Sequence, residues 1–111
     1  MSVIVKNIIP RKQAETSQTG QYTAVNCKTI IDKFTVTNTS GSNVNFSVNL
    51  VAASGTAGSD NLVLKTRAVA PNETYTCPEL VGQVLEAGGF ISTLAGSAAS
   101  LTISASGREI T

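Results

Sequence analysis

The chain offers few side chains from which an enzyme active site could be built. It contains no histidine, and histidine is the commonest general base and a common metal ligand. Hydroxyl groups are abundant, with 12 serines and 14 threonines, but the lack of an imidazole excludes a Ser-His-Asp triad. A serine activated by a lysine is the remaining hydrolytic arrangement. We therefore expect no enzyme activity and assign no catalytic residue.

The acidic side chains do not suggest a catalytic pair or a metal site. A glycosidase would need two carboxylates to converge in the folded chain, yet no two are paired in spacing. Asp60 and Asn61 could join a calcium site, although an ordinary turn explains the same pair. The glycines of residues 55–58 lack the lysine of a phosphate-binding loop. The sequence thus predicts no metal and no cofactor, and its seven carboxylates are Glu15, Asp32, Asp60, Glu73, Glu79, Glu86 and Glu109.

The two cysteines permit two interpretations. Cys27 and Cys77 lie 50 positions apart, and neither belongs to the closely spaced pairs of zinc or thioredoxin sites. They could join two strands through a disulfide, or they could act as small apolar residues of the core. We favour the second interpretation, because the chain begins without a signal peptide and is expected to fold in the cytoplasm.

Composition describes one globular domain with an unusually neutral surface. The chain has 111 residues, of which 41% are hydrophobic and only 14% charged, and its formal net charge is +1. Aromatic residues make up 5% and no basic run occurs, so a nucleic-acid partner is not expected. No apolar stretch is long enough to span a membrane, so no membrane partner is expected either.

Alternation of apolar and polar residues predicts β-strands. Any functional surface would have to be built on these strands and on the loops between them. Residues 44–52 alternate apolar and polar side chains, and residues 29–38 do so with an interruption at Ile31 and Asp32. The Asn, Ser and Gly residues between them predict an antiparallel hairpin. Further strands are expected at residues 61–69, 74–77, 90–94 and 100–110, with one helical turn at 78–81. The expected core is Ile30, Phe34, Val36, Val44, Phe46, Val48, Leu50, Leu62, Leu64, Phe90, Leu101 and Ile103.

About seven short strands separated by turn residues predict an all-β fold, a single antiparallel β-sandwich with either a Greek-key or a jelly-roll connection. The outward residues of the sheets are uncharged and include Ser47 and Asn49. We divide the chain into residues 1–27, a strand followed by a polar tether, and residues 28–111, the sandwich. The first strand, residues 3–9, is either an edge strand of the same sandwich or an arm that completes a neighbour's sheet.

The succession of segments resembles that of small virion proteins of tailed bacteriophages. The resemblance covers roughly residues 28–110 and rests on the strand and turn at 29–41, the strand at 44–51, the turn-rich stretch 69–82 and the closing segments 88–95 and 101–110. It implies a non-enzymatic component of the particle, assembled in the host cytoplasm and located in the virion. No site residue is carried over, because the matching positions are turn and strand residues.

Two functions follow as expectations. The first is a structural role as a capsid decoration (cement) protein or a head-tail connector (neck) protein, acting through symmetric self-assembly and attachment to other virion proteins of the capsid, neck or tail. The chain is then expected to form a homo-oligomer, with three copies as the number that the resemblance suggests. The alternative is a tail-tip adhesin or carbohydrate-binding module, which would use the loops at 53–60 and 95–100.

Overall fold

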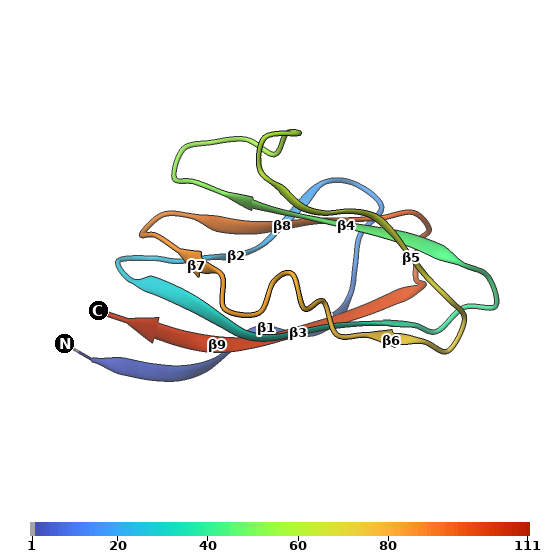
Figure 1. Cartoon of the computed structure of the whole chain (residues 1–111), viewed down its shortest axis with the longest axis horizontal. Coiled ribbons are helices and arrows are strands. Elements are labelled where there is room, and N and C mark those ends of the chain that lie inside the picture. The colour runs from blue at the N-terminus through green and yellow to red at the C-terminus, as the bar shows by residue number, and fades with distance from the viewer. Residues whose placement is uncertain (1) are drawn as a thin grey trace.

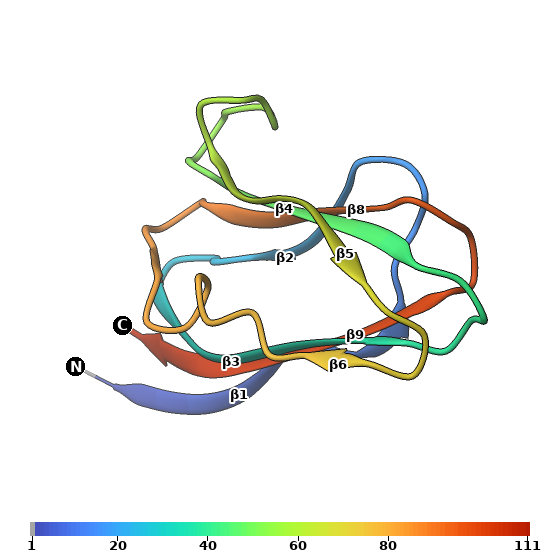
Figure 2. The ribbon, with the colours of Figure 1, turned by 45° about the vertical axis from the view of Figure 1, so that its right-hand side comes forward.

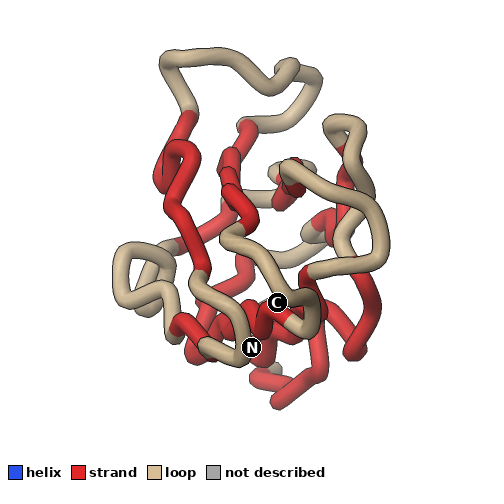
Figure 3. Tube along the Cα trace, turned by 90° about the vertical axis from the view of Figure 1, so that its right-hand side faces the viewer, coloured by secondary structure: helices blue, strands red, loops and turns tan. Residues whose placement is uncertain are grey.

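The computed structural model describes residues 2–111, and it confirms the predicted β-sandwich. Two antiparallel sheets lie face to face (Figures 1 and 2). Every described element is a strand or a loop (Figure 3). The strands are β1 (Val3–Gln13), β2 (Thr19–Thr23), β3 (Lys28–Asn38), β4 (Val44–Val51), β5 (Leu62–Val69), β6 (Thr74–Tyr75), β7 (Val84–Leu85), β8 (Phe90–Ala95) and β9 (Leu101–Ile110).

The strands pair as one long hairpin rolled onto itself. Strand β1 pairs with β9, β2 with β8, β3 with β6 and β7, and β4 with β5. The short strands β6 and β7 contact opposite ends of β3, so they act as two halves of one interrupted strand. Rolling adds the pairs β3–β9 and β4–β8, which complete the two sheets. The antiparallel hairpin expected between residues 29–38 and 44–52 is wrong, because β3 lies in one sheet and β4 in the other. We call the sheet of β1, β9, β3, β6 and β7 sheet A, and the sheet of β2, β8, β4 and β5 sheet B.

This nesting is the jelly-roll connection, one of the two that the sequence left open. The tip of the rolled hairpin is the loop of residues 52–61, which projects beyond the sheets at the upper edge of Figure 1. The two chain ends lie side by side at the opposite end of the hairpin, where Val3 pairs with Ile110.

Apolar side chains from both sheets fill the space between them. Phe34 of sheet A and Phe46 of sheet B are fully buried, with ring centroids 6.2 Å apart. Eight of the twelve expected core residues are buried: Phe34, Val36, Val44, Phe46, Val48, Leu64, Leu101 and Ile103. The remaining four are only half-buried, namely Ile30, Leu50, Leu62 and Phe90.

A β-bulge explains the largest departure from the expected core. The pairing of β3 with β9 shifts by one residue between Ile31 and Lys33. The extra residue reverses the faces of the strand on one side of the bulge. Ile31 is therefore fully buried, and Ile30, which the simple alternation places in the core, points to the outer face. Asp32, which the same alternation places on the apolar face, is exposed.

The other three departures come from strand ends and register. On β8, Ile91 is fully buried and Phe90 faces the other side, because β8 pairs with β4 in an unshifted register. Leu50 packs against the core at the end of β4, and Leu62 opens β5 beside a register shift. The expected helical turn at residues 78–81 is a pair of tight turns, closed by the bonds from Leu80 N to Cys77 O and from Gln83 N to Leu80 O.

The segment before residue 28 lies in both sheets of its own chain. Strand β1 runs along the edge of sheet A, and β2 runs along the edge of sheet B. Ile8 and Ile9 of β1 are buried, so this strand contributes to the core at its middle. Residues 11–21, expected to be a polar tether, contain the end of β1 and the start of β2.

Candidate functional site

The ionisable side chains are spread over the surface and paired locally. No group of three or more Cys, Asp or Glu side chains within residues 2–111 could hold a metal ion. No helix in the same range is long and apolar enough to cross a membrane. Most carboxylates form an ion pair with a nearby cation: Glu15 with Lys12, Asp32 with Arg108, Glu73 with Arg67, Glu86 with Lys28 and Glu109 with Lys6. Glu79 accepts a hydrogen bond from the Tyr75 hydroxyl.

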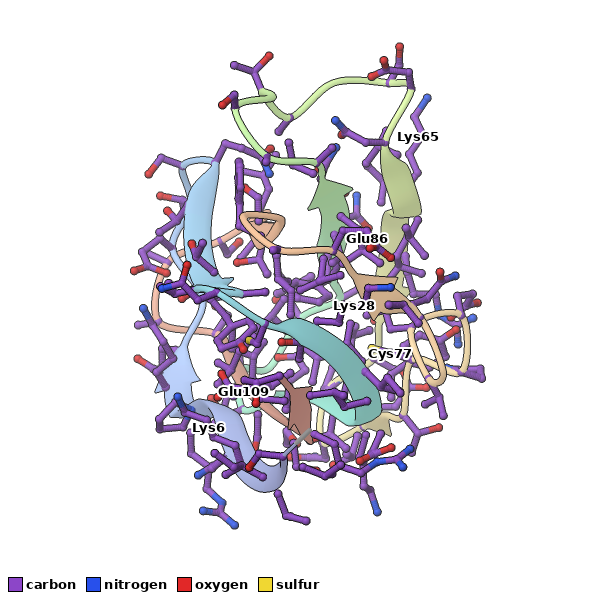
Figure 4. The ribbon with its side chains drawn as sticks, turned by 90° about the vertical axis from the view of Figure 1, so that its left-hand side faces the viewer. Lys6, Lys28, Lys65, Cys77, Glu86 and Glu109 are labelled. Atoms are coloured by element: carbon purple, nitrogen blue, oxygen red, sulfur yellow. The ribbon has the colours of Figure 1, made fainter. Side chains whose placement is uncertain are left out.

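One polar cluster ties both sheets together at the end where the chain ends meet. Glu109 of β9 accepts hydrogen bonds from the Tyr22 hydroxyl of β2 and from Lys6 of β1. The same hydroxyl lies 2.7 Å from the Thr29 hydroxyl of β3. The Tyr22 hydrogen bond, followed by the Lys6 ammonium, holds the pKa of Glu109 below its usual range. Figure 4 shows Lys6 and Glu109 side by side at the lower end of the molecule.

The cysteines are both buried free thiols. Burial raises the pKa of the Cys77 thiol to about 12, so it stays protonated and unreactive at neutral pH. Cys27 lies beside Thr29, with its sulfur 3.6 Å from the threonine hydroxyl. Their burial agrees with the interpretation of the cysteines as small core residues.

The outer face of sheet B is covered by its own chain. Ser47 and Asn49, expected to be exposed there, are only 7% and 2% exposed. Asn49 donates to the carbonyl of Gly58 and to the side chain of Asn61, and it accepts a bond from Gln18. The amide groups therefore fasten the loop of residues 52–61 onto the sheet, and their bonding capacity is spent within the molecule.

The outer face of sheet A is open. Its cross-strand neighbours can be read from the register: Val5 lies opposite Arg108, Arg108 opposite Ile30, and Ile30 opposite Val84. Directly opposite residues share one face of a sheet. One end of this face is thus a row of apolar side chains across four strands, interrupted by Arg108, which forms an ion pair with Asp32.

The middle of the same face is a shallow depression of about 510 Å³. Hydroxyl side chains of β3 and β9 line it, together with Val5 and Asn7 of β1. Arg11 and Lys33 border it, and neither forms an ion pair with a residue in the described part of the chain. The depression is therefore the place on this face where positive charge is left uncompensated.

Neither tyrosine presents a free ring for stacking on a sugar. Tyr75 carries the Arg67 guanidinium over its ring at 4.1 Å, and its hydroxyl donates to Glu79. Tyr22 packs against the core and uses its hydroxyl in the Glu109 cluster. The loop at 53–60, expected in the sugar-binding alternative, is fastened by Asn49 and Asn61.

Comparison with known proteins finds no sequence relative and a distant structural likeness. No protein-family model matches the chain, and no curated protein sequence matches it. A solved chain in the structure of infectious bursal disease virus Gx strain resembles it with a TM-score of 0.40 and 16% sequence identity over 98% of this chain. The chain spans only about a third of that chain, 32% of its length.

Sequence reasoning did not find the open face of sheet A. Two signals point to it in hindsight: the uncharged residues Ser104 and Ser106 alternate with buried residues of β9, and Val3 and Val5 alternate on β1. The part of this face that β3 contributes was not predicted, because the bulge in β3 moves Ile30 from the core to the surface.

Proposed function

We propose that this protein is a non-enzymatic structural component of a virus particle, and more narrowly a capsid decoration or neck protein of a tailed bacteriophage. It acts by self-assembly and by attachment to other virion proteins. The open outer face of sheet A carries this proposal, since it offers an exposed surface across four strands that combines a row of apolar residues with the depression beside Arg11 and Lys33. The jelly roll is an architecture that viral capsid domains use.

The depression on sheet A is the proposed attachment point. Arg11 and Lys33 supply positive charge beside hydroxyl groups, an arrangement that fits an acidic segment of another virion protein. Charge reversal of both residues is then expected to abolish incorporation into particles. Lys65→Glu is the matched control, because Lys65 is an exposed cation on the edge strand of sheet B, far from this face in Figure 4.

An image reconstruction of purified particles tests the proposal. We expect density for the sandwich on the particle surface, with the outer face of sheet A turned toward a neighbouring protein. The proposal would be contradicted if cells that make the protein yield particles from which the protein is absent after gradient sedimentation. Loss of incorporation in the Lys65→Glu control would contradict the attachment point alone.

The sugar-binding alternative requires a different surface. The depression beside Lys65 and the loop of residues 52–61 has a volume of about 270 Å³ and includes Leu62 and Leu94. The side-chain amide of Asn49, which lines this depression, already donates hydrogen bonds to Gly58 and Asn61 of the same chain. Binding of the isolated chain to immobilised glycans, abolished by Lys65→Ala, would favour this alternative over the structural role.

A further inference from the structure

The free edges of the two sheets differ in how they are protected against pairing with another chain. Strand β5 carries Lys65 and Arg67 and is interrupted by two register shifts. The free edge of β2 is five residues long and contains Gly20 and a further shift. Charges, bulges and short length are the usual means of blocking an edge.

Strand β1 is protected along one half only. Its second half has two register shifts, on either side of Ile9, and contains Pro10, Arg11 and Lys12. Its first half, Val3 to Lys6, pairs with β9 in an unbroken register. Val3, Ile4 and Val5 are 50%, 50% and 80% exposed. Val3, Ile4 and Val5 therefore form an uncharged, apolar and regular stretch of edge, followed by Lys6.

The direction of its backbone groups follows from one pair of hydrogen bonds. Ser2 and Thr111 exchange both backbone bonds, at 3.2 Å and 2.9 Å, so the N–H and C=O of Ser2 point toward β9. These groups alternate in direction along an antiparallel strand. Ile4 and Lys6 therefore point toward β9 as well, and Val3 and Val5 direct their N–H and C=O groups to the free edge.

We propose that this segment pairs with the same segment of a second copy of the chain, antiparallel, about a two-fold axis that passes beside Ile4. In this register Val3 of each copy lies opposite Val5 of the other. The pairing uses the free backbone groups of both valines, which gives four hydrogen bonds. Ile4 of one copy lies opposite Ile4 of the other.

The second copy fits because the segment is complementary to itself. Val3 and Val5 share the outer face of sheet A, and Ile4 faces the other side. Pairing Val3 with Val5 of the second copy therefore joins the free N–H and C=O groups and also places outer-face side chains opposite one another. No charge meets a like charge, because Lys6 lies opposite Ser2 of the second copy. A two-fold contact of this kind repeats one surface on both subunits.

Pairing also joins two apolar surfaces. The row of Val84, Ile30, Arg108 and Val5 on sheet A would continue into Val3 of the second copy. The two sheets would then form one continuous sheet, with apolar residues on both sides of the Arg108–Asp32 ion pair of each copy. The contact joins copies in pairs, so the three copies that the resemblance suggests would require a further surface.

A cysteine placed on the axis tests the pairing. Ile4 and its symmetry mate form a pair without mutual hydrogen bonds, whose Cα atoms lie about 4.5 Å apart. That separation falls in the range of disulfides, about 4.4–6.8 Å. Ile4→Cys is expected to form a covalent dimer under mild oxidation. Val25→Cys is the matched control, because Val25 is 67% exposed but lies in a loop outside the proposed contact.

The expected result is cross-linking of Ile4→Cys about tenfold faster than that of Val25→Cys at equal protein concentration, because pairing raises the effective concentration of the two thiols. Adding Val5→Pro removes one donor at the free edge without touching the bonds to β9. It should reduce the rate to that of the control, with thermal unfolding showing that the double variant is folded.

Equal rates for Ile4→Cys and Val25→Cys would overturn the proposed pairing, and so would a fast rate that a folded Val5→Pro variant retains. The inference rests on the self-assembly part of the proposed function, but the two can fail separately. The cross-linking rate of the isolated protein reports only on pairing at the edge of β1. Incorporation of the variants with reversed charge at Arg11 and Lys33 reports on attachment to the particle.

Discussion

Phe34 of β3 and Phe46 of β4 meet across the two sheets, with ring centroids 6.2 Å apart and planes inclined by 39°. Both rings are fully buried, so this contact joins the layers at the centre of the sandwich. Tilted aromatic pairs at this distance stabilise beyond the apolar area that they bury.

Phe46→Ala is expected to lower the free energy of unfolding by about 3–5 kcal/mol, because it leaves a cavity against Phe34. Chemical denaturation followed by circular dichroism measures the change. Phe90→Ala is a useful comparison, since Phe90 is half-buried on the other side of sheet B and should cost less. Equal losses would show that the ring pair is not central to the core.

Gly107 is expected to tolerate no larger side chain. A Cβ atom at this position would clash with the carbonyl oxygen of Ile30, beside the bulge of β3. Gly107→Ala should destabilise the fold by about 1–3 kcal/mol, as overpacking does. Gly41→Ala is the matched control, because a Cβ atom at Gly41 would meet nothing within 4 Å. Equal unfolding midpoints for the two variants would contradict the close approach.

Asn49→Ala is expected to release the loop of residues 52–61. The substitution removes the bonds to Gly58 and Asn61 and leaves Gln18 without its acceptor on Asn49. Losing such buried bonds costs about 1–3 kcal/mol. We expect faster proteolysis within the loop, and Asn45→Ala, an exposed change on the same strand, should leave it unaltered.

The Glu109 cluster predicts a loss of stability in acid. Because the pKa of Glu109 is lower in the folded protein than its ordinary value of 4.5, its contribution is complete above that pH and disappears as the pH falls through the folded value. Tyr22→Phe removes the largest cause of the shift. The difference in unfolding free energy between wild type and Tyr22→Phe should therefore shrink below about pH 4.5. A difference that stays constant down to about pH 2 would argue against this origin.

Alternation of side chains was sufficient to predict the class of fold and most of its core. Strand β4 shows why: its register with β8 has no shift, so each apolar residue from Val44 to Val48 falls on the inner face. Strand β3 shows where a strict period of two fails: its alternation is interrupted at Ile31 and Asp32, but the interruption alone does not reveal that a bulge shifts the register there and turns Ile30 outward.

The candidate surfaces were harder to predict, since they depend on contacts between distant segments. Strand β2 contains Gly20 and no aliphatic residue with a branched side chain, and it becomes a strand by pairing with β8. Asn49 was expected on an exposed face, and Gln18 and the loop from 52 to 61 cover it. Such covering depends on tertiary structure, which alternation does not describe.

The position of β9 at the centre of sheet A has a consequence for folding during synthesis. Its neighbours β1 and β3 are made first, but β9 leaves the ribosome after the other strands of the sandwich. Until then both long strands lack the partner between them, and sheet A cannot close. Such non-local pairing is slow to form. Until β9 is made, the nascent chain thus exposes both edges of β1 to other chains, so a binding chaperone or rapid synthesis of β9 would limit premature aggregation.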